Sequence, residues 1–360
     1  MKVLVLGCGL VGKTITEDLA KRHDVTVGDI THDAFSDLDP SIKTMIFNVN
    51  IPSMFQKVKA FDLVVCAVPG YLGFETLKSI IKEGVNVVDI SFFPEDALSL
   101  HELAVENGVT AVVDMGVAPG LDNLILGHFN SLMDVKYFEC LVGGLPKELN
   151  TYKAPFSPAD VVQEYLRPAR LFENGKVVTK EALSEPESIS APGTELEAFN
   201  TDGLRSLLKT MKHIPNMKEK TLRYHGHREG IEFLRDNGFF EEDRMDSTCE
   251  TLFKSWKLTP QDDEFTYMRV TVKGDEKSGW LTSNHVWELY DETDPKTRTS
   301  SMARTTGYTC CAMVESLLKN QWSKPGIFPG ELIGHDEVVF NHVISFLSDR
   351  GVTIIKNNIQ

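Results

Sequence analysis

The sequence predicts an α/β protein: a doubly wound parallel sheet with an inserted α+β domain built on a mostly antiparallel sheet. Three observations lead to this prediction. The apolar run Val3–Leu6 breaks into Gly7, Gly9 and Gly12, and short apolar segments then alternate with amphipathic ones as far as Val113. Such continuous apolar strands are typical of a parallel sheet covered on both faces. Beyond Met133 the pattern changes to strand-like runs in which polar and apolar residues alternate.

The three glycines lie between a predicted strand, Val3–Leu6, and a predicted helix, Lys13–Arg22. In this context the first glycine permits a tight turn, the second lets backbone approach a pyrophosphate, and the third lets the helix pack on the strand. Asp29 ends a second strand about 20 residues further on, where an acid binds the ribose hydroxyls of NAD and repels a 2′-phosphate. The motif therefore predicts a Rossmann-type domain that binds NAD, although a plain surface aspartate is the alternative for Asp29.

The next elements continue the same alternation. Strands are predicted at Thr44–Val49, Phe61–Val68, Val85–Ile90 and Val109–Val113, with helices over Leu72–Lys82 and Pro94–Asn107. Ligands bind beyond the carboxyl ends of such strands, so residues there are candidate cofactor contacts, with turn chemistry as the alternative for each strand end. Together with the start of a C-terminal helix, the predicted cofactor residues are Gly7, Gly9, Leu10, Val11, Gly12, Asp29, Asn48, Val49, Ala67, Val68, Pro69, Asp89, Ser91, Asp114, Gly116, Ala118, Pro119 and Met302.

The second domain is predicted from its strand-like runs. These are Val135–Gly143, Phe265–Lys273 and Trp280–Tyr290, with helices at Asp160–Leu166 and Gly203–Lys212. Two later helices, Ala303–Leu318 and Asp336–Arg350, and a strand, Val352–Ile355, are expected to pack on the first domain. We therefore expect a dinucleotide-binding domain of residues 1–133 plus 300–360 and a substrate and dimerisation domain of residues 134–299. An open sheet edge in the latter favours a homodimer or higher homo-oligomer.

Composition excludes several classes of function. The net charge of −15 argues against nucleic acid as a partner. No apolar run approaches the ~20 residues that span a bilayer, and the N-terminus enters a strand without a signal peptide, so we expect a cytoplasmic protein without membrane partners. The six cysteines show no metal-ligand spacing, so no metal is expected and the thiols are interpreted as reduced.

Residues 116–123, GVAPGLDN, resemble the GxxPGxD element of the saccharopine dehydrogenase-like reductase superfamily. Four further blocks resemble its L-lysine 6-dehydrogenase branch: APFSPADVVQEYLRPARLFENGKVV (154–178), LEAFNTDGLRSLL (196–208), KTLRYHGH (220–227) and MARTTGYT (302–309). The resemblance implies that NAD oxidises the ε-amine of L-lysine to an imine, which water converts into 2-aminoadipate 6-semialdehyde and ammonia.

Two alternatives to this function remain. Saccharopine reductases tend to carry an acid at the third position of the element and a histidine at its last, where this sequence has Ala118 and Asn123. This difference favours lysine as the substrate, but a saccharopine- or carboxynorspermidine-type enzyme acting on a secondary amine is the first alternative. A non-catalytic NAD-binding regulatory protein is the second.

Oxidation of an amine requires a base, because an alkylammonium cannot release hydride until it loses a proton. His225, in the loop-like stretch KTLRYHGHREG, is the predicted base, and Arg223 is predicted to bind the substrate carboxylate with its guanidinium fork. Solvated or backbone-bonded histidines are the alternative. Two further candidates, Tyr165 and Asp122, would bind the amine, and three more would contact the substrate: Arg167, Thr201 and Asp202. Helix capping is the alternative role for Asp122, Thr201 and Asp202. For Arg167 the alternative is that it ends a helix.

Overall fold

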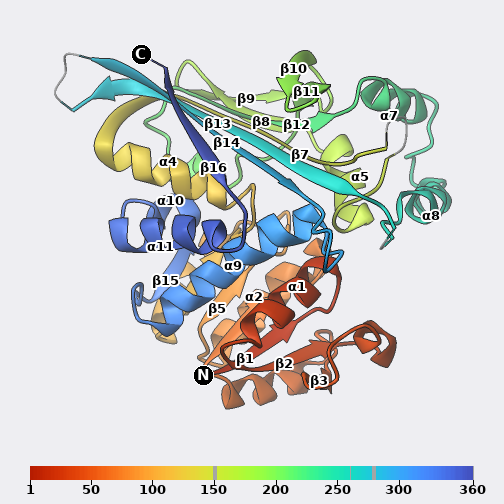
Figure 1. Ribbon diagram of the computed structural model, residues 1–360, viewed down its shortest axis with the longest axis vertical. Coiled ribbons are helices and arrows are strands. Elements are labelled where there is room, and N and C mark those ends of the chain that lie inside the picture. The colour runs from red at the N-terminus through yellow and green to blue at the C-terminus, as the bar shows by residue number, and fades with distance from the viewer. Residues whose placement is uncertain (149–151, 260, 278–280, 360) are drawn as a thin grey trace. The chain divides into compact units, whose positions relative to one another are not determined.

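The computed structural model describes residues 1–148, 152–259, 261–277 and 281–359. The chain forms two compact units, Met1–Ser131 with Ala303–Gly351 and Leu132–Met302 with Val352–Gln360 (Figure 1). The predicted domains differ from these units mainly at the C-terminus, because the chain beyond Gly351 belongs to the second unit and not to the dinucleotide-binding one.

The first unit contains a parallel sheet with the strand order β15-β6-β5-β4-β1-β2-β3, in which every neighbouring pair is parallel. The sheet grows in one direction from β1 to β3 and in the other from β4 to β15, as a doubly wound sheet does. The predicted Rossmann-type architecture is confirmed. Its strands are β1 (Lys2–Leu6), β2 (Asp24–Asp29), β3 (Lys43–Ile46), β4 (Leu63–Cys66), β5 (Val87–Asp89), β6 (Thr110–Val113) and β15 (Gly326–Pro329).

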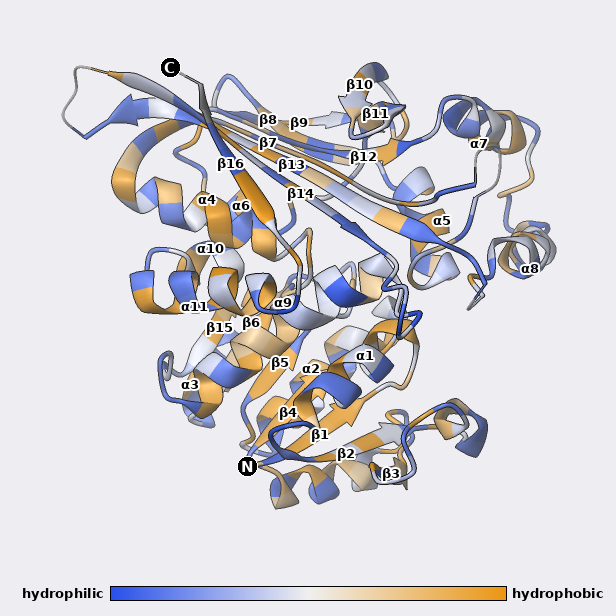
Figure 2. Ribbon diagram, in the orientation of Figure 1, coloured by the Kyte–Doolittle hydropathy of each residue, from blue (hydrophilic) through white to orange (hydrophobic). Residues whose placement is uncertain are grey.

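Strands β1, β4 and β6 are buried along almost their whole length and are the hydrophobic centre of this unit (Figure 2). The helices that accompany them are α1 (Leu10–Leu19), α2 (Gly70–Lys82), α3 (His101–Glu106), α4 (Leu121–Leu132), α9 (Ser301–Leu318), α10 (Gly330–Ile333) and α11 (Glu337–Ser348). The helix predicted over Pro94–Asn107 is wrong in its first half, where Ala97–Leu100 form a 3-10 turn that Asp96 caps through the Leu98 N–H. Strand β15 was not predicted.

The second unit contains a sheet with the strand order β10-β11-β12-β7-β13-β14-β16, and β8 and β9 extend it from β12. All pairs are antiparallel except β7 with β12, so the predicted, mostly antiparallel sheet is confirmed. Its strands are β7 (Met133–Pro146), β8 (Ala169–Glu173), β9 (Lys176–Lys180), β10 (Glu187–Ala191), β11 (Thr194–Asn200), β12 (Asn216–Arg223), β13 (Glu264–Glu276), β14 (Thr282–Glu292) and β16 (Ile354–Ile359).

Several local predictions for the second unit are wrong. A strand is present near Val352–Ile355, as predicted, but it is β16, which pairs with β14 of this sheet and does not belong to the first domain as expected. The helix predicted over Gly203–Lys212 shrinks to one turn, α6 (Leu207–Thr210). The stretch predicted as a loop from Lys220 is the end of β12 followed by α7. Trp280, where a strand was predicted to begin, lies outside the described residues. The remaining helices are α5 (Pro158–Leu166), α7 (His227–Asp236) and α8 (Met245–Trp256).

Within the described residues, no helix combines the length and the hydropathy that crossing a membrane requires.

Candidate functional site

The glycine turn connects β1 to α1, and each of its glycines meets a different environment. Gly7 has a φ of +101°, and a Cβ there would lie 2.4 Å from the Ala67 carbonyl oxygen. A Cβ on Gly12 would lie 2.1 Å from the Gly7 oxygen, whereas a Cβ on Gly9 would have no atom within 4 Å. Gly7 and Gly12 are therefore required by the fold, while Gly9 faces open space. That space fits the close approach of a pyrophosphate.

Asp29 ends β2 and binds the glycine turn. Its Oδ2 accepts a hydrogen bond from the Cys8 N–H at 2.8 Å, and its Oδ1 accepts one from the Ile30 N–H at 2.7 Å. The carboxylate is thus fixed beside the turn, which is where an acid meets the adenosine ribose in this fold. Burial, reinforced by the charge of Asp29, raises the pKa of the Cys8 thiol to about 11, so Cys8 is no nucleophile at neutral pH.

The remaining predicted contacts of the first strands lie in connecting segments. Asn48 follows β3 and its Oδ1 accepts from the Asn50 N–H at 2.9 Å, which is a local turn bond. Val49 packs against the core of this unit. Pro69 caps α2 after Ala67 and Val68. Leu10 and Val11 begin α1, and the Leu10 side chain is exposed although it is apolar.

Asp89 ends β5 and Ser91 lies two residues further on, and their side chains are buried and bonded to one another. The Ser91 N–H and hydroxyl donate to the Asp89 carboxylate at 2.9 and 2.8 Å. The pKa of Asp89 is raised to about 7, because burial and the nearby Asp114 raise it by more than the hydrogen bonds with Cys66 and Ser91 lower it. Asp114 is also buried and has a φ of +53°, which is rare for a non-glycine residue. The three polar side chains therefore face the interior of the unit.

The GVAPGLDN element forms a closed turn before α4. The Gly116 N–H donates to the Pro119 oxygen across a cis Ala118–Pro119 bond. The Asp122 carboxylate is fully buried and accepts from the Gly120 N–H at 2.8 Å. A local bond of this kind corresponds to the capping interpretation of Asp122 and not to contact with a substrate ammonium.

Met302, at the start of the C-terminal helix, is a predicted cofactor contact, and it is buried in the structure. The Met302 N–H donates to the Glu264 Oε1 of β13 at 2.6 Å, and both residues are buried. Because a helix needs acceptors for its first N–H groups, Glu264 supplies one from a different element.

A buried polar cluster in the second unit joins α5, β12 and α7. Arg223, the last residue of β12, is 2% exposed. Its Nε donates to the Tyr165 hydroxyl at 2.8 Å, its Nη1 to the Leu222 oxygen at 2.8 Å, and its Nη2 to the Glu164 Oε2 at 3.4 Å. The Tyr165 hydroxyl lies 3.0 Å from the His227 Nε2. We call these residues, with Tyr152, the Arg223 cluster.

Aromatic rings enclose the charge of this cluster. The Arg223 Cζ lies 5.1 Å from the ring centre of Tyr152 and 5.6 Å from that of Tyr165, which is favourable for a guanidinium. Burial and the Arg223 charge lower the pKa of His227 to about 3, so its ring is neutral at pH 7 and can accept a hydrogen bond from the Tyr165 hydroxyl. Burial raises the pKa of Tyr165, which keeps the phenol protonated.

The structure brings together Arg223 and Tyr165 among the predicted residues, but it places His227 beside them and not His225. His225 is half exposed, and its Nδ1 lies 4.0 Å from the Glu197 Oε1. Gly226, with a φ of +90°, turns the chain between the two histidines, and α7 then begins at His227. Gly226 was therefore the signal in the sequence: a glycine between His225 and His227 allows a left-handed turn, after which the two imidazole rings have different surroundings.

The other predicted substrate residues have partners in their own unit. The Asp202 carboxylate pairs with Arg170 at 2.7 Å, and the Thr201 hydroxyl lies 2.9 Å from that of Thr221. Neither caps a helix, since α6 begins only at Leu207, so the capping interpretation is wrong for both. Arg167 is the C-cap of α5, as the helix-terminating interpretation requires.

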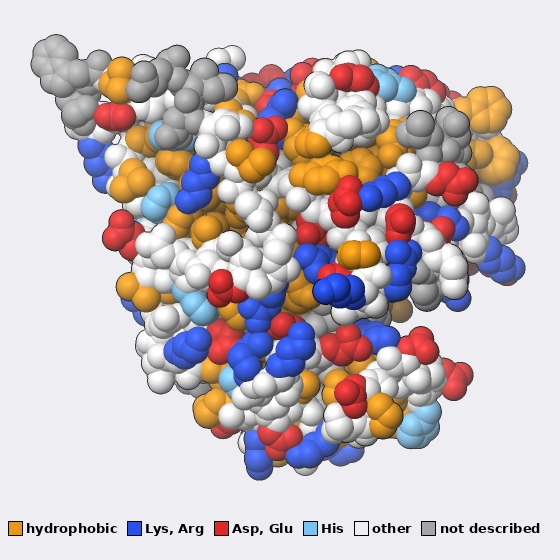
Figure 3. All heavy atoms as spheres, in the orientation of Figure 1, with side chains coloured by type: hydrophobic (Ala, Val, Ile, Leu, Met, Phe, Trp, Pro, Cys, Tyr) orange, Lys and Arg blue, Asp and Glu red, His pale blue; other side chains and the backbone are white. Residues whose placement is uncertain are grey.

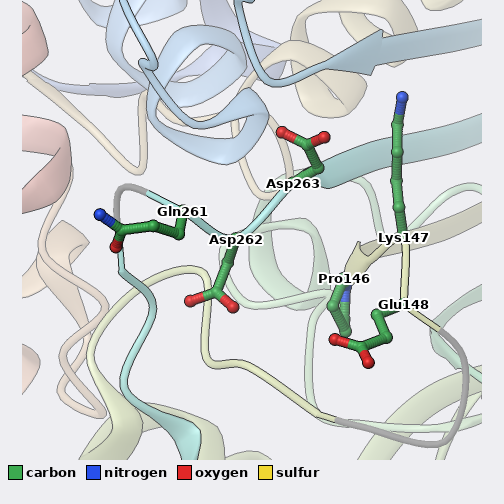
Figure 4. A pocket seen from close by; sticks show the side chains of 6 residues that line it. All are labelled: Pro146, Lys147, Glu148, Gln261, Asp262 and Asp263. Atoms are coloured by element: carbon green, nitrogen blue, oxygen red, sulfur yellow. The ribbon is translucent and has the colours of Figure 1, made fainter.

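A separate hollow of about 340 Å³ in the second unit is lined by Pro146, Lys147, Glu148, Gln261, Asp262 and Asp263 (Figure 4). Its charged side chains form ion pairs nearby, because Lys147 pairs with Glu292 and Asp263 with Arg298, both at 2.7 Å.

Across the parts of the chain that the structure describes, no group of His, Cys, Asp and Glu side chains is arranged to hold a metal ion. On the face shown in Figure 3, acidic and basic side chains are interspersed.

The parallel sheet and the glycine turn define the class: a dinucleotide-binding protein of the Rossmann type with a second unit attached. Comparison with known proteins specifies the family. Residues 3–112 match the saccharopine dehydrogenase NADP binding domain, and residues 116–352 match the saccharopine dehydrogenase C-terminal domain. The chain belongs to the saccharopine dehydrogenase-like family, and its first unit is a nicotinamide dinucleotide domain.

Individual relatives are distant. Saccharopine dehydrogenase [NADP(+), L-glutamate-forming] of Schizosaccharomyces pombe is 28% identical over 67% of this chain and 58% of its own length. The mitochondrial alpha-aminoadipic semialdehyde synthase of Rattus norvegicus is 26% identical over 66% of this chain but only 28% of its own length. The apo structure of saccharopine dehydrogenase (L-Glu forming) from Saccharomyces cerevisiae covers all of both chains with a TM-score of 0.81 at 19% identity, which shows the shared fold.

Proposed function

We propose that the protein is an oxidoreductase that uses a nicotinamide dinucleotide to oxidise the carbon–nitrogen bond of an amine derived from an amino acid. The observation that carries this proposal is the glycine turn, where Gly9 leaves open the space that a pyrophosphate would fill. Membership of the saccharopine dehydrogenase-like family supports the type of bond. The cofactor supplies the hydride acceptor.

A saccharopine-type secondary amine is the first candidate substrate. The relatives named above support it, and the buried Arg223 provides the bidentate fork that suits a carboxylate. In this reaction the CH–NH bond loses a hydride and a proton to become an imine, and water then splits the imine into an aldehyde and a primary amine. The residues of the chain must therefore hold the carboxylate and favour loss of the proton.

The Arg223 cluster affects how the amine loses that proton. The Tyr165 hydroxyl and the neutral His227 Nε2 lie 3.0 Å apart, and Arg223 donates to the same phenol oxygen. Because the pKa of His227 is lowered to about 3, its ring takes up no proton at neutral or alkaline pH, and the proton of the amine leaves to water. The positive charge of Arg223 favours the neutral amine that can release hydride. We therefore assign to Tyr165 and His227, in preference to His225, the role of orienting the neutral amine by hydrogen bonds.

Oxidation of the ε-amine of L-lysine is the second candidate. The observation that favours it is the composition of the GVAPGLDN turn, where Ala118 and Asn123 replace the acid and the histidine that saccharopine reductases tend to have. The Asn123 side chain is fully buried, and its Nδ2 donates to the Glu331 Oε2 at 3.1 Å, so this position has a packing role here.

The assay that tests the function follows NADH or NADPH absorbance after mixing protein with NAD or NADP and either saccharopine or L-lysine at alkaline pH. We expect reduction of the cofactor with saccharopine and release of L-glutamate. Reduction with lysine alone, with release of ammonia, would instead select the second candidate. Absence of reduction with either amine and either cofactor would refute the proposed function.

The fixed carboxylate of Asp29 supports a preference for NAD, although the matching family description and the yeast relatives carry NADP in their names. Exchanging Asp29 for Ala should raise the KM for NAD several-fold and lower that for NADP, because the carboxylate both binds ribose hydroxyls and repels a 2′-phosphate. The exposed Asp33, exchanged for Ala, is the control. Steady-state kinetics with both cofactors measure the effect, and an unchanged KM for NAD would show that Asp29 does not bind the ribose.

A further inference from the structure

The positive charge of Arg223 has one negative partner within the described residues. Of its three acceptors, the Tyr165 hydroxyl and the Leu222 carbonyl are neutral, and only the Glu164 carboxylate forms an ion pair with it. We propose that Glu164 stands in for the substrate carboxylate: it neutralises Arg223 in the absence of substrate and leaves the guanidinium when a carboxylate substrate binds. This inference rests on the proposed function of Arg223 as the carboxylate site.

The geometry of the pair suits an exchangeable partner. The Glu164 Oε2 lies 3.4 Å from a single guanidinium nitrogen, whereas charge-assisted bonds are typically ~2.7–2.9 Å and an arginine binds carboxylates best through two nitrogens. The Glu164 side chain is 17% exposed and that of Arg223 only 3%. The carboxylate thus has solvent to move toward, while the guanidinium is fixed by Tyr165 and Leu222. An incoming carboxylate that pairs bidentately would bind Arg223 more strongly than Glu164 does.

The charges around Glu164 make the exchange sensitive to pH. Burial raises the pKa of Glu164 to about 7; Arg223 of β12 and Arg167 at the end of α5 lower it, and Asp160 of α5 raises it. The phenols of Tyr152 and Tyr165 also face this carboxyl. Below neutral pH Glu164 can leave Arg223 as a neutral acid. Above it, the ionised carboxylate competes with the substrate, so at alkaline pH Glu164 should raise the KM for the substrate but not the KM for the dinucleotide.

Exchange of Glu164 for Gln tests the proposal, because glutamine cannot ionise but keeps the shape and a carbonyl acceptor. We expect the KM of the E164Q variant for its amine substrate to be several-fold lower than wild type at pH 9 and similar at pH 6; the comparison at each pH removes the ionisation of the amine itself, which both proteins share. Glu232→Gln, which breaks an ion pair with Arg228 on α7, is the matched control and should keep the wild-type profile. A ratio of wild-type to E164Q KM that stays constant between pH 6 and pH 9, or an E164Q KM that is higher than wild type throughout, would overturn the proposal.

A second measurement uses the unmodified protein and does not depend on turnover. L-Glutamate serves as the carboxylate probe in isothermal titration calorimetry at pH 7, in two buffers with different ionisation enthalpies. Uptake of a fraction of a proton on binding supports displacement of Glu164, and binding without proton exchange contradicts it. This titration needs no amine oxidation. It can therefore show that Glu164 is not displaced even if the protein is active, and that Glu164 is displaced even if the activity assay fails.

Discussion

Gly7, Gly9 and Gly12 are glycines for different physical reasons, and substitutions should separate them. Alanine at Gly7 or Gly12 would place a Cβ within 2.4 Å of a carbonyl oxygen, so we expect destabilisation of at least ~1–3 kcal/mol. Alanine at Gly9 meets no atom and should change stability by less than ~0.5 kcal/mol, yet raise the KM for the dinucleotide at least tenfold. Urea unfolding and steady-state kinetics measure the two effects. Equal destabilisation by all three substitutions would contradict this assignment.

The sequence is informative at single residues only where backbone geometry sets the residue type. The glycine turn and Asp29 were found because a motif of fixed spacing requires them. His225 was preferred to His227 because spacing alone does not reveal that Gly226 adopts a φ of +90° and that His227 therefore turns toward Tyr165. Glu164 was not singled out at all, since its importance comes from burial beside a residue distant in the sequence.

Among the secondary-structure elements, α9 is joined to the segment between α1 and β2 by a buried acid whose effect on stability depends on pH. The Glu315 Oε1 lies 2.7 Å from the Arg22 Nε and 2.9 Å from the His23 Nε2. Burial alone would raise the pKa of Glu315, but these bonds lower it to about 2. Because its pKa is lower in the folded protein, the Glu315 carboxylate stabilises the fold at pH values above its ordinary pKa near 4.5. That contribution is lost as the pH falls through 2.

We therefore expect Glu315→Gln to reduce the free energy of unfolding by about 2 kcal/mol at pH 7. The difference from wild type should narrow between about pH 4.5 and pH 2, as the wild-type carboxylate takes up its proton. Chemical unfolding over this pH range measures it. Glu75→Gln removes an exposed ion pair on α2 and should have little effect. A difference that is independent of pH would mean that packing, and not charge, explains the role of Glu315.

The opposite pH dependence is expected where β13 meets the start of α9. The pKa of Glu264 is raised to about 8, because burial and the charge of Asp291 raise it by more than the hydrogen bonds from the Met302 N–H and Ser300 lower it. A raised pKa means that the protonated acid stabilises the fold below about pH 4.5 and that this contribution is lost as the pH rises through 8.

Glu264→Gln can still accept from the Met302 N–H but cannot ionise. Between pH 6 and pH 9 the melting temperature of the wild type should therefore fall relative to that of E264Q, corresponding to a change of more than about 1 kcal/mol. Calorimetry across this range checks the result, with Glu276→Gln at the exposed end of the same strand as the control. Parallel melting curves for wild type and E264Q would show that Glu264 does not ionise in the folded protein.

Elements were predictable where apolar periodicity was strong. Strands β1, β4 and β6 are continuous apolar runs, because both faces of their sheet are covered. Strand β15 has only four residues, ends in a proline and follows a proline at 325, so its sequence is typical of a turn. Strands β9 and β10 carry exposed lysine, glutamate and serine. Their strand structure is set by pairing with β8 and β11, which local sequence does not encode.

For the whole molecule, the two candidate sites are built by different units of the chain. The glycine turn belongs to the first unit and the Arg223 cluster to the second. The doubly wound sheet and the mostly antiparallel sheet could both be predicted, since each has its own hydrophobic pattern. The assignment of β16 could not, because a short strand of mixed polarity is compatible with either sheet and only its pairing with β14 decides.

This separation predicts which segments each ligand protects from hydrogen exchange. A ligand present at about 100 times its Kd stabilises the state that binds it by ~2.7 kcal/mol, which suppresses local opening of the segments it contacts. NAD should therefore slow deuterium uptake in peptides that cover residues 7–12, 29–30 and 67–70, and L-glutamate in those that cover residues 152–167 and 220–228. Mass spectrometry of peptic fragments measures both. In the Gly9→Ala variant, NAD should no longer protect the glycine turn, while L-glutamate should still protect its own segments. If NAD protected residues 220–228 and not the glycine turn, the dinucleotide would bind the second unit, which would contradict the prediction.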